Sequence, residues 1–140
     1  MNTQIATTPE QSRLIACGVN PDSADMMWYS LGENRDFNLY ALGWEISRIK
    51  NRKITAYKIP AWSLSALLEL LPMEIRKDGI DFDMMLKAYP NEEECYRWCI
   101  SYYDMELEAT AYYSEASDPI EACVKIVKKL TDNGYTFNTK

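Results

Sequence analysis

The sequence predicts an α+β fold, an antiparallel sheet of about five strands with two or three helices packed mainly on one face. Two observations lead to this class. Helix-capping signals stand near both ends and in the middle of the chain, and residues 79–116 alternate apolar with polar side chains as strands do. The chain has 140 residues, 47% of them apolar, which predicts a single domain, residues 1–140, with a core of its own.

The first predicted helix begins after Thr8. Thr8 is suited to the N-cap, Pro9 to the first helical position and Gln11 to the reciprocal contact of a capping box, while Gly18 would end the helix in the left-handed conformation. The apolar side chains that this helix offers to the core are Leu14, Ile15 and Cys17.

Two stretches before residue 60 predict strands. Turn residues at 20–22 precede an apolar run from Met26 to Tyr29, which predicts the first strand. Residues 39–58 hold two β-branched and aromatic runs separated by "KNRK". They predict a β-hairpin whose tip is strongly basic.

The block "PAWSLSALLELLP", residues 60–72, predicts a helix of about two turns. Ser63 is the expected N-cap, and Trp62 can pack against Leu67 as a hydrophobic staple. Leucines recur along one face of this helix, so burial against the sheet should hold it. Packing is the favoured interpretation, and the alternative is an exposed leucine groove for a partner helix with Trp62 as its anchor.

The second half of the chain predicts a meander followed by a helix. Residues 79–90, 94–103 and 107–116 show the period of two typical of half-buried strands. Asp118 is the expected N-cap of the closing helix, and Gly134 its expected end. Pro119 at the first helical position and Glu121 in a capping box complete the signature.

The composition excludes several kinds of site. The chain has no histidine, which removes Ser-His-Asp triads, Cys-His dyads and most zinc sites. Its four cysteines are too few and too scattered for a disulfide framework, so we expect reduced, mostly buried thiols and a cytoplasmic protein. No stretch approaches the ~20 apolar residues of a membrane-spanning helix, and no cofactor-binding loop is present.

Three segments carry a resemblance to a known family. "GVNPDSADM" near the start, "PAWSLSALLELLP" and the final "DPIEACVKIVKKL" resemble small proteins of unknown activity carried by gut anaerobic bacteria and their phages or mobile elements. In that family the first segment has the form "GLxPxTADM". The resemblance implies an accessory role inside the cell and brings no catalytic residue with it.

Two clusters of side chains have alternative interpretations. Asp78, Asp81 and Asp83 in "DGIDFD" could bind a cation or do acid–base work, although a solvated strand face is the favoured interpretation. Aromatic and apolar residues alternate along one predicted strand, a pattern that suits a core face and could also stack single-stranded bases. They are Tyr96, Trp98, Ile100 and Tyr102, joined by Tyr112 of the next strand.

Charge is segregated along the chain, whose net charge is −6. Residues 91–121 carry nine acids against the single base Arg97, whereas residues 48–58 carry five bases and no acid. Those bases are Arg48, Lys50, Arg52, Lys53 and Lys58. The two regions could neutralise each other within the monomer, or one of them could meet a partner of opposite charge.

These observations favour a non-enzymatic accessory or protein-interaction protein of a phage or mobile element. The candidate contact residues are Trp62, Arg48, Lys50, Arg52, Lys53, Tyr96 and Trp98. The alternative is a nucleic-acid-contacting module that uses the basic hairpin 48–58, although the acidic chain is a poor general nucleic-acid binder. A small carboxylate-dependent enzyme is a weaker alternative. We expect no cofactor, no metal and no membrane contact.

Overall fold

The computed structural model describes residues 4–30, 37–41, 57–90 and 96–137. It confirms the α+β class and the antiparallel pairing, but the strands form two sheets in place of one. The smaller sheet has the order β2-β1-β3 and the larger the order β4-β5-β6-β7. The elements are α1 (Pro9–Ile15), a 3₁₀ turn η1 (Pro21–Ser23), β1 (Met26–Ser30), β2 (Asn38–Ala41), β3 (Tyr57–Ala61), α3 (Leu64–Leu70), β4 (Glu74–Lys77), β5 (Ile80–Pro90), β6 (Tyr96–Asp104), β7 (Ala109–Ala116) and α4 (Pro119–Asp132).

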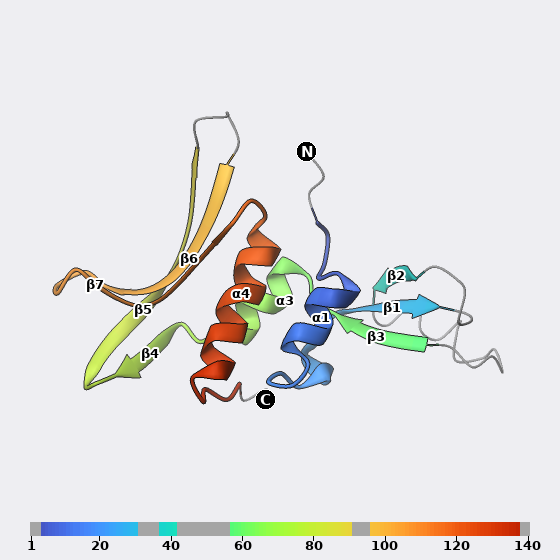
Figure 1. The fold of residues 1–140 in the computed structure, drawn as a ribbon, viewed down its shortest axis with the longest axis horizontal. Helices are drawn as coiled ribbons and strands as arrows, with labels where there is room; N and C mark the ends of the chain where they lie inside the picture. Colours follow the sequence, from blue (N-terminus) through green and yellow to red (C-terminus); the bar gives the residue numbers. More distant parts are fainter. Residues whose placement is uncertain (1–3, 31–36, 42–56, 91–95, 138–140) are drawn as a thin grey trace.

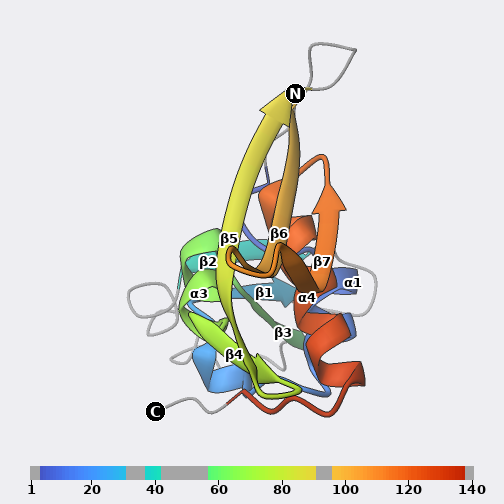
Figure 2. The ribbon, with the colours of Figure 1, turned by 90° about the vertical axis from the view of Figure 1, so that its left-hand side faces the viewer.

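The helices lie between the two sheets (Figure 1). Helix α4 packs along β7 and β6 of the larger sheet, and α1 contacts both α4 and β3 of the smaller one. Figure 2 looks onto the larger sheet from the side away from the helices. The three described helices are therefore an inner layer, and each sheet covers a different side of it.

The hairpin predicted within residues 39–58 is corrected by the strand order. Its described ends, β2 and β3, do not pair with each other, because both pair with β1 from opposite sides. Pro60 lies in β3, an edge strand of this sheet, where a residue without an N–H is tolerated.

Helix α1 begins as its sequence predicts and ends differently. Thr8 and Gln11 form the expected capping box, but the helix stops at Ile15 and Gly18 is not left-handed. Gly18 serves a close contact instead. A Cβ at this position would lie 2.4 Å from both Oγ1 and Cγ2 of Thr131 on α4. Of the residues offered to the core, Ile15 is buried whereas Leu14 and Cys17 are exposed. Successive residues of a helix point about 100° apart, so Leu14 faces away from the core when Ile15 faces it, and Cys17 lies beyond the end of the helix.

The segment before α1 fastens three elements together. The backbone N–H of Thr7 donates to Trp62 O at 2.9 Å, and the Trp62 N–H donates to Thr7 Oγ1 at 3.0 Å. The indole of Trp28 on β1 donates to Thr7 O at 2.8 Å. The N–H of Gln4 donates to the Asp118 carboxylate at the start of α4. We call residues 4–8 the N-terminal latch.

Helix α3 confirms the predicted two-turn helix and its cap. Ser63 Oγ accepts from the Ala66 N–H at 3.2 Å, and Asp25 in turn accepts from the Ser63 N–H at 2.8 Å. Leu67 and Leu71 are buried, and the other leucines of the stripe pack against the core from partly exposed positions. This block is therefore part of the packing.

The larger sheet contains the predicted meander and one strand that was not predicted. β4 and β5 form a hairpin across a two-residue turn, in which Asp78 has φ 53° and Gly79 φ 78°. Two positive φ values in succession match the type I′ turn for which Asp-Gly is a preferred sequence. Asp78 is thus a turn residue. The strands β5, β6 and β7 follow at the predicted places.

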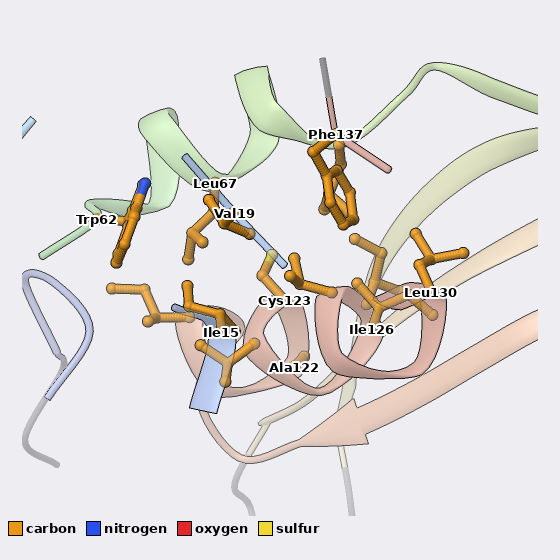
Figure 3. Packing of buried hydrophobic residues seen from close by; sticks show 14 of the residues in the cluster. Ile15, Val19, Trp62, Leu67, Ala122, Cys123, Ile126, Leu130 and Phe137 are labelled. Atoms are coloured by element: carbon orange, nitrogen blue, oxygen red, sulfur yellow. The ribbon is translucent and has the colours of Figure 1, made fainter. Parts of the chain in front are cut away.

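Helix α4 is the centre of the core (Figure 3). Its buried side chains meet Ile15, Trp62 and Leu67 from α1 and the α3 region. Burial raises the pKa of Cys123 within this core to about 12, so its thiol stays protonated at neutral pH. The Asp118 carboxylate accepts from the Ile120 N–H, one residue earlier than a capping box requires. The helix ends at Asp132, and Gly134 follows it with the predicted left-handed backbone, φ 82°.

Candidate interaction surface

The larger sheet has one face in the core and one face turned away from the helices. Phe82 of β5 and Ile100 and Tyr102 of β6, all at even-numbered positions, are buried beneath the helices. Odd-numbered residues of the same strands point to the opposite side. No described helix lies in front of that side in Figure 2, and the connection between β6 and β7 curls across β5 there. We call it the outer face.

A cluster of five side chains lies on the outer face, near the end of the sheet where β5 and β7 end and β6 begins. Strand register places Tyr89 of β5 opposite Arg97 of β6, and Cys99 of β6 opposite Glu115 of β7. Tyr113 stands two residues before Glu115 on β7, so both side chains share this face. We call these five residues the outer-face cluster.

Glu115 is the acceptor at the centre of this cluster. The hydroxyls of Tyr89, at 2.5 Å, and of Tyr113 both donate to Glu115 Oε2. Arg97 Nε donates to the other oxygen, Oε1, at 2.6 Å, so the two charges form an ion pair. One carboxylate therefore fixes two phenol rings and a guanidinium from three strands.

The hydrogen bonds set the ionisation of these groups. Donation first from Tyr113, then from Tyr89, and also from Arg97 lowers the pKa of Glu115 from 4.5 to about 2. The same bonds to Glu115 raise the pKa of Tyr89 and of Tyr113 above the usual 10. At neutral pH the carboxylate is therefore charged and both phenols are protonated donors.

Cys99 lies beneath this network. Burial raises the pKa of its thiol, and the side chain is only 9% exposed. A protonated and covered thiol is a poor nucleophile. Cys99 is therefore a packing residue below the tyrosines.

The two tyrosines combine exposure with fixed positions. Tyr89 is 38% exposed and Tyr113 is 43% exposed, although both rings are held by Glu115. Tyrosine is enriched at the energetic centres of protein interfaces, and a ring that is already ordered loses less conformational entropy on binding. The cluster has the chemistry of a contact site for another protein.

The free edge of β7, next to the cluster, is covered by α4. Lys125 Nζ donates to the backbone oxygen of Glu115 at 3.1 Å, and Lys129 Nζ donates to that of Tyr113. Backbone oxygens on a sheet edge would otherwise be available to pair with another strand. The two lysines therefore occupy two backbone oxygens on the edge of β7.

Trp62 does not lie on a surface. It is 1% exposed, and its Nε1 donates to Ser23 Oγ at 2.9 Å. The packing interpretation of residues 60–72 is confirmed, and a docking role for Trp62 would require the indole to leave the core.

The predicted aromatic strand face belongs largely to the core. Ile100 and Tyr102 are 0% exposed, and Trp98 packs against the core from a half-buried position. The Tyr112 ring lies 4.8 Å from Lys77 Nζ. These rings are not free to stack bases. Tyr96, at 55% exposure, lies near the end of the same face.

The predicted basic tip falls outside the described residues, because Arg48, Lys50, Arg52 and Lys53 lie between β2 and β3. Of that basic set, Lys58 is described, and its ammonium lies 5.8 Å from the centre of the Tyr29 ring.

Two acids of the 91–121 region pair with bases that lie outside residues 48–58. Arg97 pairs with Glu115, and Lys125 of α4 pairs with Glu121 at 3.9 Å. Part of the acidic region is therefore neutralised within the chain by bases other than those of residues 48–58.

The three aspartates do not form a metal site. Asp78 belongs to the β4–β5 turn, and Asp81 and Asp83 are exposed, with Asp81 4.0 Å from Arg76 Nε. Among the described residues, no group of three or more Cys, Asp or Glu side chains is placed to hold a metal ion.

Sequence reasoning missed Tyr89, Tyr113 and Glu115. The available signal was the second face of the predicted meander, where Tyr89, Arg97 and Glu115 take alternate positions on adjacent strands. Using that signal requires the strand register.

Comparison with protein-family models, curated proteins and solved structures found no match. A search of the described residues found no helix that combines the length and the apolar character required to cross a membrane.

Proposed function

We propose that this protein is a non-enzymatic interaction module whose outer-face cluster binds a protein partner. One observation carries the proposal: Tyr89 and Tyr113 are exposed and fixed by the same carboxylate, on a sheet face that no described helix covers. Exposed, ordered tyrosines beside an arginine form the kind of patch that dominates protein–protein binding energy.

The charges of the outer face favour a protein over a nucleic acid. Arg97 is already paired with Glu115, and Arg76 of β4 lies 4.0 Å from Asp81 on the same face. The described base of β5 on this side is Lys87. Asp81 and Asp83 share that side of the strand. Nucleic-acid binding draws its affinity from bases that neutralise phosphates, and this face offers little free positive charge. The basic segment 48–58 stays a separate prediction.

The proposed setting is an accessory role in the cytoplasm, encoded by a phage or mobile element. The resemblance in "PAWSLSALLELLP" and "DPIEACVKIVKKL" supports this origin. The free thiols of Cys17, Cys99 and Cys123 support a reducing compartment.

The test is capture of partners from a lysate of the encoding organism, with and without nuclease. The bait is compared with a Tyr89→Ser/Tyr113→Ser double variant. The matched control is Tyr96→Ser, which removes a more exposed ring from the opposite face of the sheet. A urea unfolding curve for each bait excludes loss of binding through unfolding.

We expect a stoichiometric protein that survives nuclease and binds the Tyr96→Ser bait as it binds the parent. Loss of two contact tyrosines at about 2 kcal/mol each, about 4 kcal/mol together, should weaken its binding ~700-fold in the double variant. Equal capture by parent and double variant would refute the outer-face cluster as the site. Material that disappears with nuclease would favour the nucleic-acid alternative.

A further inference from the structure

A cavity of about 260 Å³ opens between α1, η1 and β3, away from the outer face. Ser12, Trp62 and Val19 are buried residues of its lining. The remaining described lining residues are Arg13, Ala16, Pro21, Lys58, Ile59 and Pro60. Apolar side chains therefore make up most of this lining.

The charged groups at this cavity are of one sign. Arg13 comes from α1 and Lys58 from β3, and both are exposed. Among the described residues neither is part of an ion pair, and no described acid lines the cavity. Lys58 keeps its ammonium 5.8 Å from the Tyr29 ring, which orders the side chain without neutralising it.

We propose that this cavity binds a small organic anion with an apolar body, of the arylalkyl carboxylate class. A cavity of about 150 Å³ is enough for benzene, so the larger volume here has room for a ring and a short chain. The ring would lie against Trp62, Val19 and Pro60, and the carboxylate would meet Arg13 and Lys58 at the rim. This site is independent of the proposed protein contact.

The probe is 4-phenylbutyrate, titrated into the ¹⁵N-labelled full chain in a phosphate-free buffer and followed by NMR. Its uncharged counterpart is 4-phenyl-1-butanol, which has the same ring and chain length. We expect saturable shifts that include the amides of Ala16, Val19 and Ile59, with a Kd in the millimolar range. The alcohol should bind about tenfold more weakly, since a charge-assisted contact distinguishes the two probes.

Variants separate the charge from the cavity. Arg13→Gln and Lys58→Gln should each weaken 4-phenylbutyrate binding about 3–10-fold. Arg76→Gln is the matched control, because Arg76 is an exposed base on the far sheet, and it should leave the Kd unchanged. Ala16→Leu places a larger side chain in the cavity from an exposed helix end and should abolish binding of both probes.

Four outcomes would overturn the proposal. They are no saturable shift, equal affinity for the alcohol, equal loss in the Arg76→Gln control, and unchanged binding in Ala16→Leu.

Discussion

Replacing Gly18 with alanine tests whether α4 and the turn after α1 are in direct contact. The added Cβ would lie 2.4 Å from Oγ1 and Cγ2 of Thr131 and 3.0 Å from its Cβ. Thr131 is β-branched, and its Oγ1 donates to Val127 O at 2.9 Å, so the side chain has little freedom to turn away. The turn and α4 must therefore move apart.

Two opposing terms decide the size of the effect. Overpacking of this kind costs about 1–3 kcal/mol. Because Gly18 is not left-handed, alanine also fits its backbone and should stabilise the protein by about 0.4–1 kcal/mol through the unfolded state. The midpoints give a net loss of about 1.3 kcal/mol in the free energy of unfolding.

Urea unfolding followed by circular dichroism measures this loss in the free energy of unfolding. A double-mutant cycle tests whether the loss comes from the contact between Gly18 and Thr131. In a Thr131→Ala background both clashing atoms are gone, so Gly18→Ala should become neutral or slightly stabilising. The coupling free energy between the two sites should then be about 1 kcal/mol or more. A Gly18→Ala protein as stable as the parent, or one with the same loss in both backgrounds, would refute the contact.

Three further predictions concern the larger sheet. Gly79→Ala should destabilise the protein by about 1 kcal/mol in urea unfolding, because the position has φ 78°. No atom lies within 4 Å of the added Cβ, so backbone strain is the expected cause and steric overlap is not. An unchanged stability would contradict the assigned turn. The pKa of Glu115 is lowered to about 2, so the contribution of its carboxylate to folding stability is complete above pH 4.5 and is lost as the pH falls toward 2. Glu115→Gln should therefore flatten the dependence of Tm on pH between these values. Parallel curves for the parent and the variant would contradict this prediction. Lys125→Ala/Lys129→Ala should make the protein associate at high concentration in analytical ultracentrifugation through the uncovered edge of β7, whereas Lys87→Ala, on the outer face, should stay as monodisperse as the parent.

The parts of the fold that depend on local chemistry were predictable. Thr8 with Gln11, Ser63 and Asp118 each begin a helix at the expected residue, because a cap needs only neighbours a few positions away. The β4–β5 turn was equally local and was missed, because Asp78-Gly79 was interpreted as part of an acidic cluster.

The division into two sheets depends on long-range pairing. β2 and β3 carry ordinary strand patterns, and nothing within them specifies that β1 will lie between them. The outer-face cluster has the same origin. Glu115 meets Tyr89 only after the register of three strands is set, including the irregularity between Tyr102 and Tyr103.

The N-terminal latch has a consequence for how the protein is made. Gln4 and its partner Asp118 are 114 residues apart, so at about 5–20 residues per second a ribosome adds the second roughly 6–23 s after the first. Through this interval the nascent chain also lacks α4, the centre of the core. The N-terminal latch and the core can therefore form only after most of the polypeptide has been synthesised. Until then the apolar surfaces of β1, β3 and α3 stay exposed. We expect the nascent chain to bind chaperones that recognise exposed apolar segments, and the protein to be released from them once α4 packs into the core.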